Sequence, residues 1–278
     1  MTVEELIGQV EDLSATAPSV VKLLGLLNRE TVDNESVVEV VREDVVLSAK
    51  MLALVNSAFF APPSPVESLT EALFFLGYEQ VYRLGLAVAL GGVMNRKAAG
   101  YAMDEGEFWR HSLVTAKAGE LLAGDWRKSD AGLGYTAGLL HDIGKLVLNQ
   151  FLDPAAQAEV TRAIQERGQA GIQAEQALLG MNHAEVGAAL LRKWALPEPI
   201  VEAVALHHDY TKSSNRLPAI IALADAMAHV VASGSSVLSG EAESELLNAV
   251  GIEPTNYERL LGEVSEALEG VETVVRIN

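Results

Sequence analysis

Histidine and carboxylate residues that suit a metal site are concentrated in the second part of this chain. The stretch GLLHDIGKLVLNQF, from Gly138 to Phe151, places His141 beside Asp142 at the end of an apolar run. Imidazole and carboxylate groups together suit divalent first-row transition metals. The chain has six histidines, which are His111, His141, His183, His207, His208 and His229. Because none of them lies in the first hundred residues, the sequence predicts a site in the second part of the chain.

One candidate pair precedes the His-Asp dipeptide. Glu107 and His111 are four residues apart and therefore share one face of a helix, so both could reach the same ion. Asp104 and Glu107 also fit a capping box, in which the glutamate bonds back to the start of the helix. Two roles are therefore open to Glu107, as a metal ligand or as a helix cap.

The dipeptide itself poses a geometric problem, because adjacent side chains on a regular helix diverge by about 100°. His141 and Asp142 can share a site only if the carboxylate spans the gap, binding two metal ions with its two oxygens. Lys145, three residues later, could lie over a bound phosphate or project into solvent as an ordinary helix cation.

The remaining candidates lie on later segments. His183 falls beside a predicted helix start, and His207 and His208 fall at a predicted helix end, where both could turn toward one point. Asp225 lies in the run ALADAMAHV, which is so apolar that a buried carboxylate there needs a partner. That partner is either a metal ion or His229, four residues later on the same face. In a further alternative no metal binds, and the histidines form hydrogen-bonded pairs in the core.

Composition limits the classes of protein to which the chain can belong. With 278 residues, 49% of them hydrophobic, it can bury a substantial core. Its formal charge of −18 repels phosphate backbones and anionic lipid. We therefore expect that the protein binds neither nucleic acid nor a membrane. A small phosphorylated ligand stays compatible, because a bound metal ion reverses the local field. The chain has no cysteine, so any metal would be held by nitrogen and oxygen.

Two segments bear on where in the cell the protein is located, namely the N-terminal stretch and the longest apolar run. The stretch MTVEELIGQVEDL is acidic and amphipathic, and it lacks the basic start and apolar centre of a signal peptide. The apolar run from Leu84 to Met94 is too short to cross a bilayer. A cytoplasmic protein is therefore expected.

Apolar residues recur at a spacing of three to four along nearly the whole chain, which predicts an all-α protein. In the first part the predicted helices lie near residues 3–13, 18–28, 34–42, 44–57, 67–76 and 78–94. In the second part they lie near residues 105–124, 130–151, 155–168, 170–180, 183–194, 197–208, 217–231, 242–250 and 255–269. The stretch FFAPPSPVESL predicts a loop. The charged, glycine-bearing segment 95–106 predicts a boundary between two lobes, residues 1–100 and 101–278.

Taken in order, the candidate ligands resemble the metal-ligand series of the HD superfamily of metal-dependent phosphohydrolases, in the arrangement of the HD-GYP phosphodiesterases. The segments LLHDIGKL, NHAEVGAALL and ALHHD are similar to the corresponding segments of that group. The resemblance extends over residues 106–228. It implies a site for two or more metal ions, held by Glu107, His111, His141, Asp142, His183, His207, His208 and Asp225.

The first part of the chain resembles the HDOD domain, a signalling relative of the HD fold. The similar segments are APSVVKLLGLLN, LSAKMLALVNSAFF and SLTEALFFLGYEQVYRLGLAVAL. Together the resemblances imply an all-α, two-lobed helical bundle of HDOD and HD type, acting in signal transduction with a signalling protein partner in trans. After His208 the sequence DYTKSSNRLP has no counterpart to the glycine-tyrosine-proline loop of HD-GYP enzymes, so cyclic di-GMP is not implied.

The resemblance also implies a chemistry. Asp142 would bridge two ions and orient a water between them, and Lys145 would neutralise charge on a phosphoryl group. The ligand set suits iron, manganese, cobalt, nickel or zinc without choosing among them. A catalytic chain would hydrolyse a phosphoester, such as a nucleotide or another small phosphorylated ligand. HDOD domains commonly lack several HD ligands, so the alternative is a non-catalytic interaction module whose metal site is absent or structural.

Overall fold

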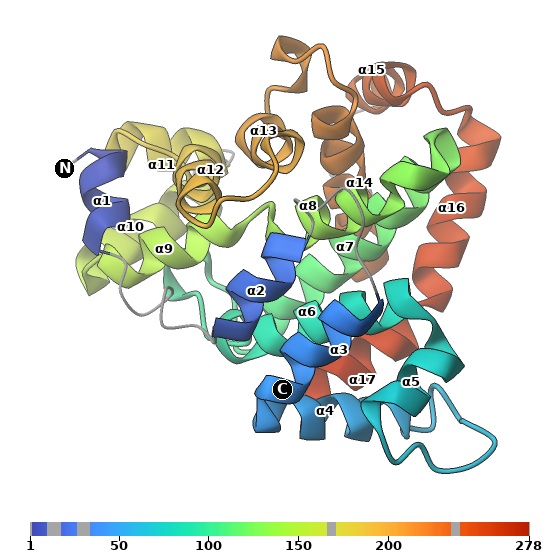
Figure 1. Ribbon diagram of the computed structural model, residues 1–278. Helices are drawn as coiled ribbons and strands as arrows, with labels where there is room; N and C mark the ends of the chain where they lie inside the picture. The colour runs from blue at the N-terminus through green and yellow to red at the C-terminus, as the bar shows by residue number, and fades with distance from the viewer. Residues whose placement is uncertain (1, 10–17, 27–33, 166–170, 235–239, 278) are drawn as a thin grey trace.

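The structure is a computed structural model that describes residues 2–9, 18–26, 34–165, 171–234 and 240–277 (Figure 1). Most of the chain in these ranges is helical, and the only pairing of the β type within them is an isolated bridge between Ala98 and Met103. The prediction of an all-α protein is therefore confirmed. Within the same ranges no helix has the length and apolar character needed to cross a lipid bilayer.

Five helices from the first part of the chain form a group at one end of the molecule (Figure 1). They are α2 (Pro18–Leu26), α3 (Asn34–Glu43), α4 (Val45–Val55), α5 (Leu69–Leu76) and α6 (Tyr78–Met94). Helix α4 begins after Asp44, whose carboxylate accepts the backbone N–H groups of Val46 and Leu47 at 3.1 and 3.0 Å. The predicted loop follows α4 and is held by Asn56, whose side-chain amide bonds the backbone of Val66 in both directions at 2.8 Å.

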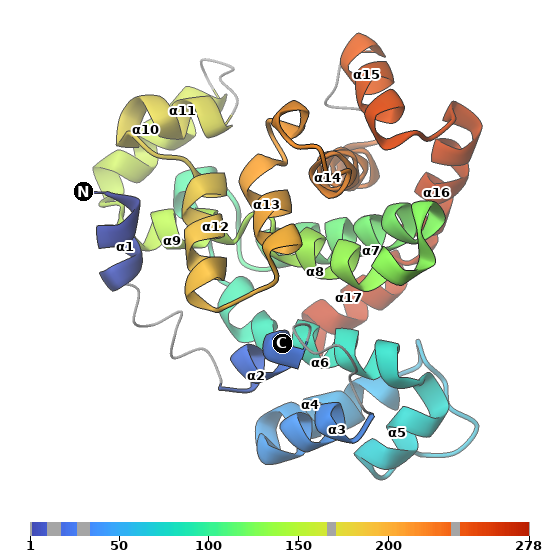
Figure 2. The same ribbon diagram turned by 45° about the horizontal axis from the view of Figure 1, so that its top comes forward.

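The second part of the chain is built around α7 (Glu107–Trp126) and α8 (Ala131–Leu140), which lie side by side in the centre (Figures 1 and 2). The other α-helices of this part are α9 (Ile143–Phe151), α10 (Pro154–Gln165), α11 (Gly171–Leu179), α12 (His183–Lys193), α13 (Glu198–Leu206), α14 (Leu217–Ser233), α15 (Gly240–Val250), α16 (Pro254–Glu266) and α17 (Leu268–Ile277). Short 3₁₀ turns are η1 (Ala99–Tyr101), η2 (Lys128–Asp130) and η3 (Tyr210–Lys212).

Most predicted helices are present, with two differences. The sequence predicts one helix over 130–151, but the structure has α8 and α9, which are separated at His141 and Asp142. Asp142 leaves helical geometry at φ −101° and ψ 6°, so that α9 turns away from α8 to pack on α12. Helix α17 was not predicted, because only the short break near Ala267 separates it from α16. The predicted helical residues 10–13, 27–28, 166–168 and 170 lie outside the described residues.

The contact between α7 and α8 is unusually close at Gly138. A Cβ atom added there would lie 2.6 Å from the carbonyl oxygen of Thr115, so only a hydrogen fits between the two backbones. His111 precedes Thr115 by one helical turn, and His141 follows Gly138 by nearly one turn. The close approach therefore brings two of the predicted ligands toward each other.

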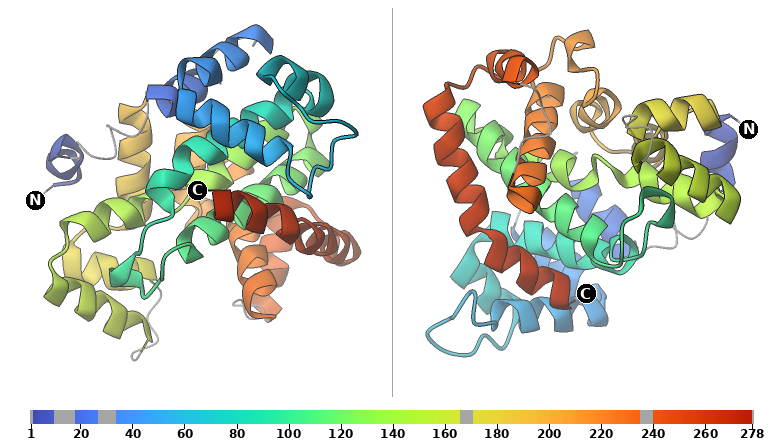
Figure 3. Two further views of the ribbon diagram at one scale, coloured as in Figure 1. Left: turned by 90° about the horizontal axis from the view of Figure 1, so that it is seen from below. Right: turned by 180° about the vertical axis from the view of Figure 1, so that it is seen from behind.

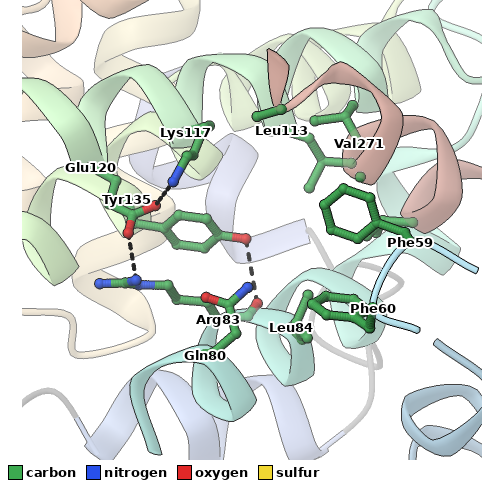
Figure 4. A pocket seen from close by; sticks show the side chains of 13 residues that line it. Phe59, Phe60, Gln80, Arg83, Leu84, Leu113, Lys117, Glu120, Tyr135 and Val271 are labelled. Atoms are coloured by element: carbon green, nitrogen blue, oxygen red, sulfur yellow. Dashed lines mark hydrogen bonds and ion pairs between the residues drawn. The ribbon is translucent and has the colours of Figure 1, made fainter. Parts of the chain in front are cut away.

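The two parts of the chain meet at a small cavity lined by α6, α7, α8 and α17 (Figure 4). Arg83 of α6 bonds Glu120 of α7 at 2.5 Å, and Lys117 bonds the other oxygen of Glu120 at 3.1 Å. The Tyr135 hydroxyl donates to the carbonyl oxygen of Arg83 at 3.4 Å. Because these groups are largely shielded from solvent, they fix the position of α6 against the central helices.

Both terminal helices lie against the part of the chain that is distant in sequence (Figure 3). Helix α1 (Val3–Gln9) packs on α12, where Lys193 donates to the carbonyl oxygen of Ile7 at 2.9 Å. Helix α17 packs against α4 and α6 as well as α7. The division into lobes 1–100 and 101–278 stays a prediction, and any such division is crossed by these two helices.

Candidate metal centre

The structure gathers all six histidines, with Asp142 and Asp225, where the central helices meet. His111 lies in α7, His141 and Asp142 between α8 and α9, His183 at the start of α12, His207 and His208 after α13, and Asp225 and His229 in α14. Their ligand atoms form three adjoining groups, each with all atoms within 4.8 Å of one another. A metal ion could be held by each of these groups.

The first group is formed by Asp142 with His183, His207 and His208. The His183 Nε2 atom lies 3.2 Å from Asp142 Oδ1 and 3.0 Å from His208 Nε2. The His207 Nε2 atom lies 3.9 Å from the same Asp142 oxygen. Asp142, His183 and His207 are buried, whereas His208 is exposed, so the group is accessible from the His208 side.

The second group is formed by the other oxygen of Asp142 with His111 and His141. His141 Nε2 lies 3.3 Å from Asp142 Oδ2. His111 Nε2 lies 3.4 Å from His141 Nε2 and 3.9 Å from Asp142 Oδ2. The break between α8 and α9 thus solves the problem posed by the adjacent residues, because it points one carboxylate toward two sets of imidazoles. A carboxylate in this position can bridge two metal ions.

The third group is formed by His111, Asp225 and His229. His111 Nε2 lies 3.0 Å from Asp225 Oδ1, and His229 Nε2 lies 3.5 Å from the same oxygen. His111 therefore stands between the second and third groups, as Asp142 stands between the first and second.

Hydrogen bonds at Nδ1 determine which nitrogen each buried imidazole offers to the centre. His141 Nδ1 lies 2.8 Å from the carbonyl oxygen of Gly138, and His207 Nδ1 lies 2.8 Å from that of Val204. A carbonyl only accepts, so Nδ1 is the protonated nitrogen in both rings, and the neutral ring has its lone pair on Nε2. These lone pairs point at the oxygens of Asp142.

Two buried atoms of the centre lack hydrogen-bond partners among the described residues. They are Asp142 Oδ1 and His207 Nε2, which face each other at 3.9 Å. Both carry lone pairs, so no proton of either side chain can join them, and each unsatisfied buried group costs about 1–3 kcal/mol. A cation bonded to both would satisfy them. The donor set therefore fits a metal that takes nitrogen and oxygen ligands.

Lys145 lies over the carboxylate of Asp142. Its Nζ atom is 2.5 Å from Asp142 Oδ2, and its side chain is 17% exposed. Burial by itself would lower the pKa of Lys145, but the charge of Asp142 outweighs it and raises the pKa above its ordinary value. The structure thus places a permanent positive charge inside the centre and does not leave Lys145 as a solvated surface cation.

The two carboxylates of the centre stay ionised. Burial alone would raise the pKa of Asp142, but His141 and Lys145 outweigh it and hold the pKa well below its ordinary range. Burial would likewise raise the pKa of Asp225, yet its hydrogen bond and electrostatic interaction with His111 lower it. Both groups are therefore available as anionic ligands at neutral pH.

Acid is expected to destabilise the metal-free protein. Burial, with the neighbouring imidazoles, holds the pKa of His207 well below 6.5 and lowers the pKa of His208 to about 4. The unfolded chain therefore binds more protons than the folded chain as pH falls from about 6.5 to 4, and stability is lost in that window. His141, whose pKa is raised because Asp142 outweighs its burial, acts in the opposite direction but is a single group.

The measurement is the urea midpoint of unfolding at pH 7.5 and pH 5.0, with chelator present. The midpoint should be lower at pH 5.0, and the difference should shrink in His207→Gln. An unchanged or higher midpoint at pH 5.0 would show that these rings are not held neutral in the folded chain.

Sequence reasoning missed Glu175, which supports the centre from behind His183. Its carboxylate is fully buried and lies 2.7 Å from both His183 Nδ1 and the His183 backbone N–H. The capping box of Asn182 and Glu185 fixes His183 as the first residue of α12 and aims it at this carboxylate. No local spacing reveals the pair, since the two residues are on different helices joined by a turn.

Replacing Glu175 by glutamine is expected to weaken metal binding about 10–100-fold, which is the usual effect of losing such a supporting carboxylate. The amide can keep one hydrogen bond but no longer makes the imidazole more basic. Isothermal titration of the metal-free protein with Co²⁺ measures the change. Glu185→Gln is the matched control, because it removes an exposed carboxylate nearby and retains the capping box. Equal affinities in the two variants would contradict the assigned role.

Among the predicted ligands, Glu107 is not brought to the centre. Its carboxylate accepts the backbone N–H of Asp104 at 2.8 Å, which is one half of the predicted capping box. The other half is missing, because α7 begins at Glu107 after Gly106 and no side chain caps it. It belongs to none of the three groups found among the described residues. His229 was expected only as a partner of Asp225, but the structure places it with both Asp225 and His111 in the third group.

Comparison with known proteins agrees with the resemblance to the HDOD domain and with the helical architecture. The sequence profile of the HDOD domain matches residues 13–210 of this chain. A curated relative, an uncharacterised protein of Treponema pallidum, is 25% identical over 72% of this chain. The match spans 38% of that relative's own length, so the relative carries long segments outside it.

Two solved structures share the fold. A protein of Marinobacter aquaeolei, named provisionally as a signal transduction protein, has a TM-score of 0.80 at 21% identity and covers 99% of this chain and 64% of its own. A protein of Shewanella amazonensis, named provisionally as a phosphohydrolase, has a TM-score of 0.77 at 23% identity and covers 99% of this chain and 98% of its own. With the profile matching most of its length, the chain belongs to the HDOD domain family.

Proposed function

We propose that this HDOD protein holds two divalent transition-metal ions, bridged by Asp142, and hydrolyses a small phosphoester. The observation that carries the proposal is that the two oxygens of Asp142 face two separate sets of imidazole nitrogens. The buried lone pairs at Asp142 Oδ1 and His207 Nε2 call for a cation. Iron, manganese, cobalt, nickel and zinc all suit such ligands.

The first ion would be held by Asp142, His183, His207 and His208, and the second by Asp142, His111, His141 and Asp225. When bound, a pair of such ions supplies a hydroxide near neutral pH and neutralises charge on a phosphoryl group.

The chain's own residues would hold and orient the reacting groups. Glu175 keeps the lone pair of His183 directed at Asp142 by holding the proton on Nδ1. Lys145 places its charge 2.5 Å from Asp142, where it would also attract a phosphoryl oxygen. The buried walls exclude water from one side of the centre, and His208 is exposed on the other.

The charge of the whole chain favours a small ligand. With a formal charge of −18, it repels a long phosphate backbone, whereas two divalent ions would reverse the field within the centre alone. A nucleotide or another small phosphorylated molecule fits this balance better than a nucleic acid. The provisional name of the Shewanella protein is consistent with phosphoester chemistry.

The first test is elemental analysis of protein purified without added metal and without oxygen. We expect two or more ions per chain in the wild type and, in Asp142→Ala, a loss of the two ions that Asp142 would hold. Asp209→Ala is the control, because Asp209 is a carboxylate near the centre that pairs with Lys212 on the surface. An equal metal content in wild type and Asp142→Ala would end the metal-site proposal.

The second test is turnover of mono- and diesters of p-nitrophenyl phosphate and of nucleotides, with the identified metal present. Lys145→Met should keep its metal and lose about 100-fold in kcat, the typical loss for one group that stabilises transition-state charge. Wild-type protein that binds metal but hydrolyses no ester would end the catalytic part of the proposal and leave the metal site in place.

A second candidate function, protein binding, is favoured by apolar side chains exposed on the first helices. Phe74, Val45 and Val46 are 87%, 80% and 65% exposed on α5 and α4. Large apolar groups in water commonly mark protein contacts. None of the three metal groups found in the described part of the chain contains a residue from these helices. A signalling protein partner in trans would bind here without needing the metal centre.

Photo-crosslinking in cells from a reactive residue placed next to Phe74 tests this candidate. A defined crosslinked protein should persist in Asp142→Ala and disappear in Phe74→Ser, while Leu178→Ser serves as an exposed apolar control on α11. A crosslink that is insensitive to Phe74 would refute partner binding at this surface.

A further inference from the structure

We propose that His229 is a metal ligand, and that with Asp225, and with His111 when His111 does not bind the second ion, it forms an additional ion position open to a cavity on the outer side of the centre. The inference rests on the proposed function, because it adds an ion position to the same centre. The ligand would be a divalent transition-metal ion, since two imidazoles and a carboxylate provide nitrogen and oxygen donors.

Spacing of the ligand atoms is the first argument. A metal ion with bonds of about 2.1 Å in tetrahedral geometry holds its ligand atoms about 3.4 Å apart. Asp225 Oδ1 lies 3.0 Å from His111 Nε2 and 3.5 Å from His229 Nε2. The two imidazole rings are tilted at 45° with centroids 4.9 Å apart, which keeps both Nε2 atoms near the same carboxylate oxygen. The atoms are thus already spaced as ligands of one ion.

A hydrogen-bonded pair of Asp225 and His229 explains this geometry less well than a shared metal ion does. At 3.5 Å, the separation exceeds the usual range for a hydrogen bond between a ring nitrogen and a carboxylate oxygen. The same oxygen already accepts from His111 at 3.0 Å and has His141 Nε2 at 3.8 Å. Three imidazole nitrogens around one carboxylate oxygen are better satisfied by a shared cation than by three competing protons.

Access is the second argument. A cavity of about 460 Å³ lies between α7, α14 and α17, and His111 and His229 form part of its wall. This volume is within the range of small-molecule sites. The His229 side chain is 42% exposed, so an ion bound there would keep positions free for water or a ligand from the cavity. The rim carries one cation, Arg110, bonded to Glu272 at 2.5 Å.

His111 links this position to the rest of the centre. Its Nε2 atom is 3.4 Å from His141 Nε2 and 3.0 Å from Asp225 Oδ1. With one lone pair on that atom, His111 can bind the ion of the second group or the ion of the third group, but not both at once. The inference therefore concerns the bond to His229, and its test must observe that bond directly.

The test uses crystals of the full chain grown with chelator and then soaked in Co²⁺, with anomalous difference maps recorded for cobalt. A peak within bonding distance of His229 Nε2 is expected in the wild type and in Glu107→Gln, and should be absent in His229→Ala. Glu107→Gln is the matched control, since Glu107 lines the same cavity but is turned to the Asp104 backbone. In solution, His229→Ala should weaken one Co²⁺-binding step by about tenfold or more.

The outcomes separate this inference from the proposed function. Peaks at Asp142 without a peak at His229 would overturn the inference and leave the two-ion proposal standing. Loss of the outer peak in Glu107→Gln but not in His229→Ala would also overturn it, because the glutamate would then be the ligand. No peak anywhere in the wild type would overturn both proposals. Because His229 is half-exposed, His229→Ala should fold, which the unfolding temperature with chelator verifies.

Discussion

Gly144→Ala is expected to destabilise the protein by about 3–5 kcal/mol, which is the upper range for a single substitution. Gly144 lies in the first turn of α9, directly against the start of α12. A Cβ atom there would lie 1.9 Å from the carbonyl oxygen of His183 and 2.7 Å from the backbone nitrogen of Gly187. Neither is a flexible side chain, so α9 and α12 would have to separate.

The separation would also damage the metal centre, because Asp142 precedes α9 and His183 begins α12. The His183 Nε2 to Asp142 Oδ1 distance of 3.2 Å depends on this contact. We therefore expect weaker metal binding in any Gly144→Ala protein that still folds.

Thermal unfolding of the metal-free protein measures the effect, with an expected fall in Tm of about 10 °C for a chain of this length. Gly262→Ala is the matched control, because Gly262 lies within α16 with no heavy atom within 4 Å of an added Cβ. That change should be neutral or stabilise the helix by up to about 1 kcal/mol. Similar losses in both variants would show that the contact between α9 and α12 is looser than described.

The second large effect is expected from Asp142→Asn in the presence of metal. Each ion that binds only the folded wild type should add about 4 kcal/mol of stability at a concentration 1,000 times its Kd, so that one ion alone raises Tm by about 10 °C. The variant should lose most of this gain, because the amide offers no anionic oxygen to the two ions that Asp142 would hold. It should also be less stable without metal, since Lys145 loses the carboxylate 2.5 Å from its Nζ atom.

Differential scanning calorimetry with chelator and with Co²⁺ measures both consequences. Asp209→Asn is the control, because it makes the same chemical change at a half-exposed carboxylate that pairs with Lys212 at 2.5 Å. A metal-dependent rise in Tm that was as large in Asp142→Asn as in the wild type would place the ions elsewhere. If Co²⁺ did not raise the Tm of the wild type, metal binding by the folded chain would be refuted.

Much of the fold could be predicted because helical periodicity is a local property of the sequence. Spacing of apolar residues located α6 over residues 78–94 as observed, and prolines marked the loop after α4. The break between α8 and α9 could not be predicted, since GLLHDIGKL continues the helical pattern without a proline. That break depends on a long-range contact, the packing of Gly144 against His183.

For the candidate site, the residue types, their order along the chain and the absence of cysteine ligands could be read from the sequence alone. Those features suffice to propose a nitrogen and oxygen metal site, and N-terminal segments such as LSAKMLALVNSAFF suffice to indicate the HDOD family. Which side chains converge depends on contacts between helices. These contacts leave Glu107 bonded to the Asp104 backbone, bring His229 beside Asp225 and place Glu175 behind His183. The physical reason is that ligand geometry depends on distances between helices. Those distances are fixed by close backbone contacts, as at Gly138 and Gly144, between residues far apart in the chain or on different helices.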